Sequence, residues 1–329
     1  MSEKPVIVFF GSDAICLPVL DYLRTEASAL CQLRAVVSQP DRPQGRGKKL
    51  QSNPVAAWAK AHGVELLQPE KPTAELAEWL READVAVALV MAYGHFLSQA
   101  LREAPRCGMF NFHGSLLPKY RGASPVETAI ASGDVETGVG LMEVVREMDA
   151  GGVADVEKVR IEATATGPEV RGKIGVAVVP LLRRNLDALL RGQLLCVPQD
   201  LAAVSYARKI SREDGGINFA LPAQQIYDRL RAFTPWPGGY FEHAGVRIKV
   251  GRASCRENAS EQACGTVVEL EPALCIATEG GEICFHELQR PGGRLLPVAD
   301  FLRGYPISVG AQCESTETEP LVRLRAEGC

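Results

Sequence analysis

The sequence predicts an α/β fold in which a doubly wound, mostly parallel sheet is followed by a small β-barrel domain of the oligonucleotide-binding (OB) kind. Short apolar runs alternate with segments of helical spacing through the first part of the chain, which is the pattern of βαβ units. Later, short strand-like runs follow one another between turn signals, as in a small barrel. At 329 residues the chain is also longer than one core usually requires, so two domains are expected.

The first domain is expected to span residues 1–195. Val6–Phe10 is a continuous apolar run that ends at a Gly-Ser-Asp turn, which is typical of a buried parallel strand leading into a helix. Pro180 is expected to kink or break the last helix of this domain. Further strands are predicted at 33–38, 64–67, 85–91, 108–110 and 137–144, and helices at 14–23, 53–62, 74–83, from 124 onward and at 169–193.

A lapse in periodicity places a linker at 196–207 and the second domain at 208–312. Residues 313–329 are polar and acidic and are expected to form a tail. The barrel rests on a predicted helix at 223–232 and on short strands predicted at 239–242, 246–250, 265–270, 274–278 and 283–288.

The composition limits the classes of function. The net charge is −4 and the pI is about 5.9, so the chain as a whole is not a basic nucleic-acid-binding protein, and any such contact must rest on local patches. The ten cysteines are scattered without a C-x-x-C pair or zinc-like spacing, so we expect them to be reduced and expect no metal. Without a signal segment or an apolar run of membrane-spanning length, the expected location is cytoplasmic, with no membrane contact.

The residues best suited to chemistry lie around 111–122. Asn111 and His113 follow a short apolar run two residues apart, so both are expected on one face of a strand at its carboxyl end. Open α/β sheets bind their ligands at that edge. Asp149 stands in a second, Gly-flanked turn. Each residue alone is more often a packed or turn residue, but a carboxamide, an imidazole and a carboxylate together are the set that acyl transfer to an amine requires.

Residues 39–50, with the sequence QPDRPQGRGKKL, form a strongly basic segment in an otherwise acidic protein. Its two prolines and two glycines predict a flexible loop, and a solvated turn without function would have the same composition. The segment leaves the predicted sheet at the carboxyl edge that also carries Asn111 and His113. It is therefore a candidate for gripping the phosphates of a substrate that enters the site.

The motifs N-x-H-G-S-L-L-P-x-Y-R-G, from Asn111 to Gly122, and M-D-A-G, from Met148 to Gly151, resemble those of the methionyl-tRNA formyltransferases. Asn-x-His and the later Asp alone would indicate only the wider folate-dependent formyltransferase superfamily. The basic segment, R-A-F-x-P-W-P at 231–237 and D-F-L-R-G at 300–304 narrow the resemblance, which extends to about residue 310. Gly152, where Asp is common, and the short turn at 11–14 depart from the family pattern.

The resemblance implies a Rossmann-like formyltransferase domain and an OB-like tRNA-binding domain in a monomer that contains no metal. The implied reaction moves the formyl group of 10-formyltetrahydrofolate, a folate cosubstrate, to the α-amine of initiator methionyl-tRNA. Asn111 and protonated His113 would donate hydrogen bonds to the oxyanion, and Asp149 would hold His113 and take the proton of the amine. The implied pterin site is lined by the backbone of Ser115, Leu116, Leu117 and Pro118, and the implied tRNA contacts are Arg42, Arg46, Lys48, Lys49, Arg208, Lys209, Arg247 and Lys249.

Other classes of function share part of this pattern. A formyltransferase that acts on a sugar nucleotide or a purine precursor would need the same Asn, His and Asp, but not the basic segment. An RNA-binding α/β plus barrel protein without catalysis would need the basic segment, but not the three polar side chains. A nucleotide-dependent dehydrogenase is disfavoured, because a lone Gly11 follows the first strand in place of the G-x-G-x-x-G fingerprint.

Overall fold

The computed structural model describes residues 4–44, 49–257 and 261–324, and the chain divides into two compact units. Unit 1 comprises Met1–Gly122, Glu136–Arg160 and Val170–Ser205. Unit 2 comprises Ala123–Val135, Ile161–Glu169 and Tyr206–Cys329. Unit 2 is therefore assembled from the last part of the chain and two short segments that interrupt unit 1.

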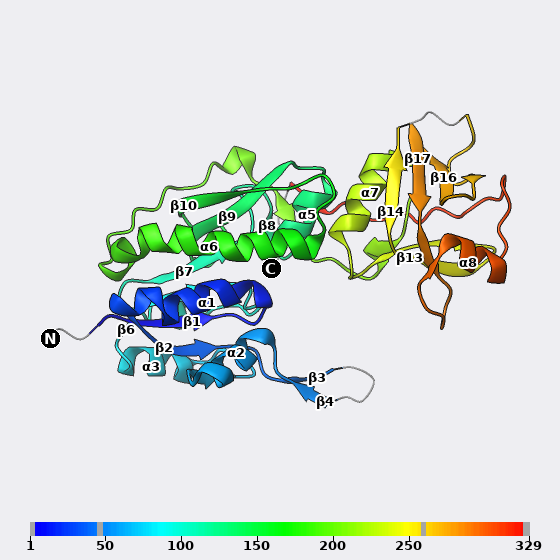
Figure 1. Ribbon diagram of the computed structural model, residues 1–329. Helices are drawn as coiled ribbons and strands as arrows, with labels where there is room; N and C mark the ends of the chain where they lie inside the picture. Colours follow the sequence, from blue (N-terminus) through cyan, green and yellow to red (C-terminus); the bar gives the residue numbers. More distant parts are fainter. Residues whose placement is uncertain (1–3, 45–48, 258–260, 325–329) are drawn as a thin grey trace. The chain divides into compact units, whose positions relative to one another are not determined.

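The described part of unit 1 is built on a seven-stranded sheet with the order β10-β9-β7-β6-β1-β2-β5 (Figure 1). The five strands from β7 to β5 in that order run parallel, and β9 is antiparallel to both of its neighbours. The predicted mostly parallel sheet is confirmed. The strands are β1 (Val6–Phe10), β2 (Gln32–Val37), β5 (Glu65–Leu67), β6 (Val85–Val90), β7 (Met109–His113), β9 (Glu136–Glu143) and β10 (Val153–Arg160).

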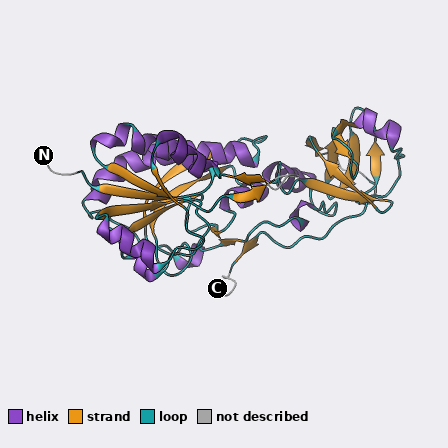
Figure 2. Cartoon of the chain, turned by 90° about the horizontal axis from the view of Figure 1, so that it is seen from below, coloured by secondary structure: helices purple, strands orange, loops and turns teal. Residues whose placement is uncertain are grey.

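Helices cover both faces of this sheet (Figure 2). On one face α1 and α6 run together, and the Arg183 guanidinium lies 5.1 Å from the centroid of the Tyr22 ring. On the other face Leu76 and Leu80 of α3 pack into a buried cluster with Val8 and Ala88 of the sheet. The helices are α1 (Leu17–Arg24), α2 (Pro54–His62), α3 (Ala74–Glu82), α4 (Gln99–Arg102) and α6 (Gly167–Leu190), with 3-10 turns at Ala14–Cys16, Glu26–Ala29 and Leu201–Ala203.

The predicted break at Pro180 is wrong, because α6 continues through it from Gly167 to Leu190. A proline inside a helix costs about 3 kcal/mol. Each apolar side chain that α6 buries returns roughly 1.5–3 kcal/mol, so tertiary packing outweighs the local penalty. The fully buried side chains of α6 are Val170, Ile174, Val178, Leu181, Leu182 and Leu186.

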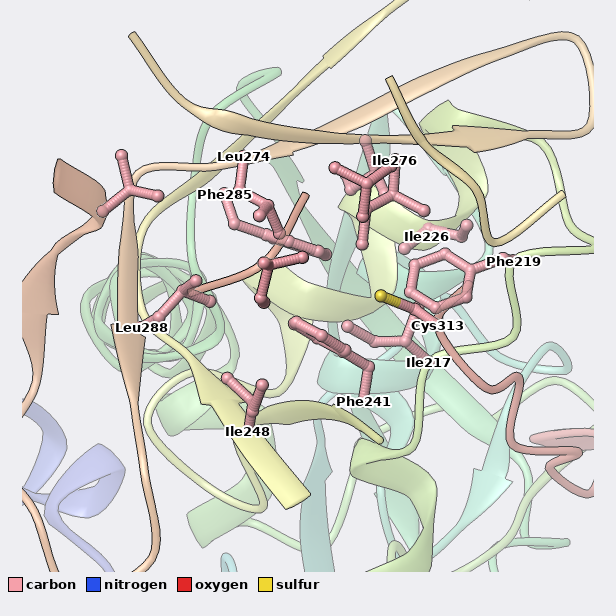
Figure 3. Packing of buried hydrophobic residues seen from close by; sticks show 14 of the residues in the cluster. Ile217, Phe219, Ile226, Phe241, Ile248, Leu274, Ile276, Phe285, Leu288 and Cys313 are labelled. Carbon is pink, nitrogen blue, oxygen red and sulfur yellow. The ribbon is translucent and has the colours of Figure 1, made fainter. Parts of the chain in front are cut away.

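Unit 2 contains two antiparallel four-stranded sheets, β12-β13-β18-β19 and β14-β17-β16-β15, with α7 and α8. Their apolar faces enclose one core, in which the rings of Phe241 and Phe285 stack with centroids 5.4 Å apart (Figure 3). The elements are α5 (Pro125–Ala131), β11 (Tyr206–Ala207), α7 (Ala223–Ala232), β12 (Gly239–His243), β13 (Val246–Val250), β14 (Ala253–Arg256), β15 (Val267–Glu269), β16 (Leu274–Thr278), β17 (Gly281–Phe285), β18 (Glu287–Gln289), β19 (Leu296–Pro297), α8 (Val298–Gly304) and β20 (Val322–Arg323), with a 3-10 turn at Glu213–Gly215.

The expectation that every cysteine is reduced is wrong for one pair. Cys275 on β16 and Cys284 on β17 lie directly opposite each other and form a buried disulfide. Sequence spacing does not reveal which residues face each other across two strands, so the pair escaped notice. Among the described residues these two cysteines and Glu282 form the one group of candidate metal ligands, and the two sulfurs are already bonded to each other.

None of the helices in the described ranges combines the length and the apolar character that crossing a bilayer requires.

Candidate active site

β7 carries Asn111 and His113 on one face, near the carboxyl ends of the parallel strands. The strand lies inside the sheet, parallel to β6 on one side and antiparallel to β9 on the other. Phe112, between the two polar residues, points to the opposite face and is buried. His113 is 5% exposed, whereas Asn111 is partly exposed. The strand therefore holds a carboxamide and an imidazole about 7 Å apart along its length.

The His113 ring is oriented by a backbone carbonyl. Its Nε2 lies 2.8 Å from the carbonyl oxygen of Tyr120. A carbonyl oxygen can only accept, so Nε2 carries the proton in this contact. Nδ1 lies 3.5 Å from Asp149 Oδ2, which is longer than a well-formed hydrogen bond. Nδ1 therefore faces the Asp149 carboxylate without a well-formed hydrogen bond to it.

Asp149 lies in the turn between β9 and β10 with a backbone φ of +51°, in the left-handed region. Such a conformation costs about 1–3 kcal/mol for a residue other than glycine, although Asp tolerates it better than most. Its Oδ2 accepts a hydrogen bond of 2.8 Å from the Gly122 backbone N–H. The strained backbone thus turns the carboxylate toward the segment that follows β7 and toward His113.

The segment between His113 and β8 (Arg121–Gly122) packs down on β9. A Cβ at Gly138 of β9 would lie 2.4 Å from the carbonyl oxygen of Glu157 on β10, so this position requires glycine, and Cδ2 of Leu116 would lie 2.6 Å from the same Cβ. Ser115 is fully buried and donates its hydroxyl hydrogen to the carbonyl oxygen of Lys119 at 2.6 Å. The Ser115 hydroxyl is thus used within the segment, and a ligand there would meet backbone groups. The predicted folate contacts of residues 115–118 stay a prediction.

The Asp149 turn is closed by two glycines with little space around them. A Cβ at Gly151 would lie 2.0 Å from the carbonyl oxygen of Glu143, and one at Gly152 would lie 2.9 Å from Cβ of Cys196. The departure from the family pattern at Gly152 therefore has a local reason, because the side chain of Cys196 takes the space that an Asp would need.

The two ends of the basic segment pair with each other as a hairpin. β3 (Arg42–Gln44) pairs antiparallel with β4 (Lys49–Gln51), where a flexible loop was expected. Arg42 is exposed, and its Nη2 lies 2.7 Å from Oε2 of Glu70, which is also exposed. Arg46 and Lys48 lie outside the described residues, and Lys49 belongs to β4.

Asp41 anchors this hairpin, and sequence reasoning missed it. Its carboxylate accepts hydrogen bonds from Gln68 Nε2 at 2.8 Å, and from Lys60 Nζ and Ser52 Oγ at 2.9 Å each. These hydrogen bonds lower the pKa of Asp41 to about 2, and the largest contribution comes from Gln68, followed by Lys60. A charged group at the start of β3 is therefore tied to α2 and to the chain after β5.

In unit 2 the predicted tRNA-binding residues occupy different surroundings. Arg208 donates to both carboxylate oxygens of buried Asp214 and to the carbonyl oxygens of Glu319 and Pro320, so its guanidinium is used within the unit. Arg247 and Lys249 lie on the exposed face of β13, and Lys209 is also exposed. The Arg247 guanidinium stacks over the Tyr240 ring, 4.1 Å from its centroid. The role of each in tRNA binding stays a prediction.

Sequence reasoning also missed Arg121 and Gln199. Arg121 is buried, and its Nε and Nη2 donate to Oε1 of Gln199 at 3.1 and 2.9 Å. Gln199 in turn donates to the backbone of the Asp149 turn. Arg121 belongs to the Y-R-G motif that supported the family resemblance, but no role was predicted for its side chain. Gln199 fell in the expected linker, and no local pattern marked it.

The fixed imidazole, the carboxylate that faces it and the nearby carboxamide lie at the carboxyl edge of a mostly parallel sheet, and this set of groups suits a group-transfer enzyme. Family models support this class. The model described as formyl transferase matches residues 4–177, and the model described as formyl transferase, C-terminal domain, matches residues 209–306. The chain belongs to the formyl transferase family.

Two curated relatives make the match specific. The chain is 38% identical to the methionyl-tRNA formyltransferase of Sorangium cellulosum, an alignment that covers 92% of this chain and 97% of the relative. It is 39% identical to that of Thermus thermophilus, over 93% and 98% of the two chains. The family resemblance inferred from the sequence is confirmed.

A solved structure shares the fold. It is the N-formyltransferase from Helicobacter canadensis in complex with folinic acid and dTDP-3-aminofucose, with a TM-score of 0.63 and 18% identity over 86% of this chain and 98% of that one.

Proposed function

We propose that this enzyme transfers the formyl group of 10-formyltetrahydrofolate to the α-amine of initiator methionyl-tRNA. The observation that carries the proposal is the His113–Asp149 pair at 3.5 Å beside Asn111. The names of relatives that are 38 and 39% identical over nearly the whole chain support the acceptor. Folinic acid in the Helicobacter canadensis structure supports a folate as formyl donor.

Asn111 and His113 would stabilise the oxyanion that develops when the amine attacks the formyl carbon. No hydrogen bond joins the Asn111 carboxamide to another described residue, so its N–H is available to a substrate oxygen. With Nε2 directed at Tyr120, protonated His113 would donate through Nδ1. One well-placed donor of this kind is worth about 3 kcal/mol of barrier.

Asp149 would balance the charge of the imidazolium and collect the proton of the amine. Oδ2 faces Gly122 and His113. No described residue donates a hydrogen bond to Oδ1, so this oxygen can take a proton directly or through one water. The new C–N bond forms first and gives the tetrahedral oxyanion. When the oxyanion collapses, the bond from the formyl carbon to the folate nitrogen breaks, and the collected proton can pass to that nitrogen.

The basic hairpin would meet the acceptor stem of the tRNA. Exposed ion pairs such as Arg42–Glu70 are worth about 0–1 kcal/mol, so Arg42 can exchange the carboxylate for a phosphate at little cost. We further infer that unit 2 contributes an OB-like barrel whose exposed Arg247 and Lys249, with the half-buried Tyr240, contact the stem. The boundaries 1–195 and 208–312, a monomeric state and a cytoplasmic location belong to the same proposal.

The deciding experiment offers the purified protein 10-formyltetrahydrofolate together with one acceptor at a time. The acceptors are methionyl-tRNA, free methionine and a dTDP-linked amino sugar. We expect formylmethionine on tRNA and no product with the other two. Formylation of the amino sugar with none on methionyl-tRNA would instead indicate a formyltransferase that acts on sugar nucleotides. Binding of tRNA without any formyl product would indicate an RNA-binding protein without catalysis.

A further inference from the structure

Gln199 uses its whole carboxamide to connect two segments of the active site. Its Nε2 donates to the carbonyl oxygens of Asp149 and Gly151, each at 2.8 Å. Its Oε1 accepts both hydrogen bonds from Arg121, at 3.1 and 2.9 Å. A primary amide has two donors and two acceptor lone pairs, so every one of its hydrogen-bonding positions is used.

One of these contacts is made by the residue whose backbone conformation is costly. The two carbonyl oxygens lie on either side of Ala150, and Asp149 is the residue with φ of +51°. Arg121 is followed by Gly122, whose N–H donates to the carboxylate of Asp149. One side chain thus ties the backbone of the Asp149 turn to the strand that binds the Asp149 side chain.

Only an amide suits this position. Glutamate could still accept from Arg121, but a carboxylate has no N–H to offer the two carbonyl oxygens and would repel them. A methionine of similar length would leave those two carbonyl oxygens and the buried Arg121 guanidinium without partners.

We propose that Gln199 is a positioning residue for Asp149, and this inference rests on the proposed formyl transfer. By holding the turn in its left-handed conformation, Gln199 keeps the Asp149 carboxylate beside Nδ1 of His113. It touches neither reacting group, so its effect on the reaction passes entirely through Asp149.

The test compares Gln199→Met and Gln199→Glu with the parent enzyme, each alone and combined with Asp149→Asn. For the single variants we expect kcat to fall by roughly 100-fold, the loss that a displacement of about 1 Å produces, with KM for either substrate nearly unchanged. In the Asp149→Asn background the same changes should have little further effect, because the group being positioned is already lost. Single variants with parental kcat, or an equal loss in both backgrounds, would overturn the inference.

A crystal structure of Gln199→Met supplies a readout that needs no activity. We expect the separation between Asp149 Oδ2 and His113 Nδ1, 3.5 Å here, to lengthen. A variant that keeps this distance and the left-handed φ of Asp149 refutes the positioning role, even if it is less stable. If the parent enzyme transfers no formyl group, the proposed function is refuted. The distance between Asp149 and His113 in Gln199→Met would still decide whether Gln199 positions Asp149.

Discussion

Replacing Asp149 by Asn removes one charge while keeping the shape of the turn. Asn also tolerates a positive φ, and its carbonyl oxygen can still accept the hydrogen bond from Gly122. What changes is the group that faces His113, because an amide balances no positive charge on the imidazole. The substitution therefore probes charge rather than folding.

The distance sets the size of the effect. Two unit charges 3.5 Å apart attract by about 5 kcal/mol at an effective dielectric constant of 20, and by about 1 kcal/mol in water. The two side chains are 6 and 16% exposed, which favours the upper part of that range. A loss of about 3–4 kcal/mol of transition-state stabilisation corresponds to a decrease in kcat of roughly 10²- to 10³-fold.

Initial rates of formylmethionyl-tRNA formation measure this loss, with tRNA affinity measured separately by filter binding. We expect kcat to fall and the affinity to stay within about twofold, since the Asp149 carboxylate contacts Gly122 and His113 and none of the predicted tRNA-binding residues. Glu147→Gln is the matched control, because the exposed side chain of Glu147 lies in the same turn and loses the same charge. Equal rates for the parent and Asp149→Asn, or an equal loss in the control, would refute the reasoning.

Three further predictions concern the hairpin, its anchor and the disulfide. Arg42→Ala should raise KM for tRNA by roughly tenfold and reduce by about one the slope of log K against log salt concentration for tRNA binding. Arg106 is an equally exposed arginine paired with Asp84, and Arg106→Ala should change neither quantity. Asp41 has a folded pKa of about 2, below the unfolded value of about 3.9, so its contribution to stability is present above pH 4 and lost as the pH falls toward 2. The difference in urea stability between the parent and Asp41→Asn should shrink over that window, and a constant difference would contradict the assignment. Thiol titration of the unfolded, unreduced protein should find eight of the ten cysteines, and Cys275→Ala with Cys284→Ala should lower the unfolding free energy by about 2–3 kcal/mol; ten reactive thiols would exclude the bond.

Strands and helices with one strong periodicity were predicted closely from the sequence. The apolar runs of β1 and β6 and the helix α7 fell where expected, because each has to bury a continuous face. β10 was missed, since the apolar and charged residues of VADVEKVR do not follow a two-residue alternation, and only its pairing with β9 makes it a strand. The continuity of α6 across Pro180 was likewise decided by packing, which no local pattern reports.

In the candidate site, too, the features set by local spacing were predictable and those set by tertiary contacts were not. Asn111 and His113 share a strand face, so their spacing alone could place them together. The approach of Asp149 to His113 depends on its positive φ and on two backbone hydrogen bonds, and neither is visible in residue types. Gln199 and Asp41 were missed for a related reason, because each is an ordinary polar residue that matters only through partners far away in the sequence.

The segment from His113 to Gly122 controls both members of the central pair. The Tyr120 carbonyl fixes the His113 ring, and the Gly122 N–H fixes the Asp149 carboxylate, so the two groups are held by points two residues apart on one backbone. Ser205 in turn holds this stretch, because its hydroxyl accepts from the Tyr120 N–H at 3.0 Å and its carbonyl oxygen accepts from the Arg121 N–H at 2.8 Å. A shift of this short segment would move the imidazole and the carboxylate together and preserve their separation. A shift of the Asp149 turn alone would change that separation, which is why the contacts of Gln199 bear on the reaction more directly than their distance from the reacting atoms suggests.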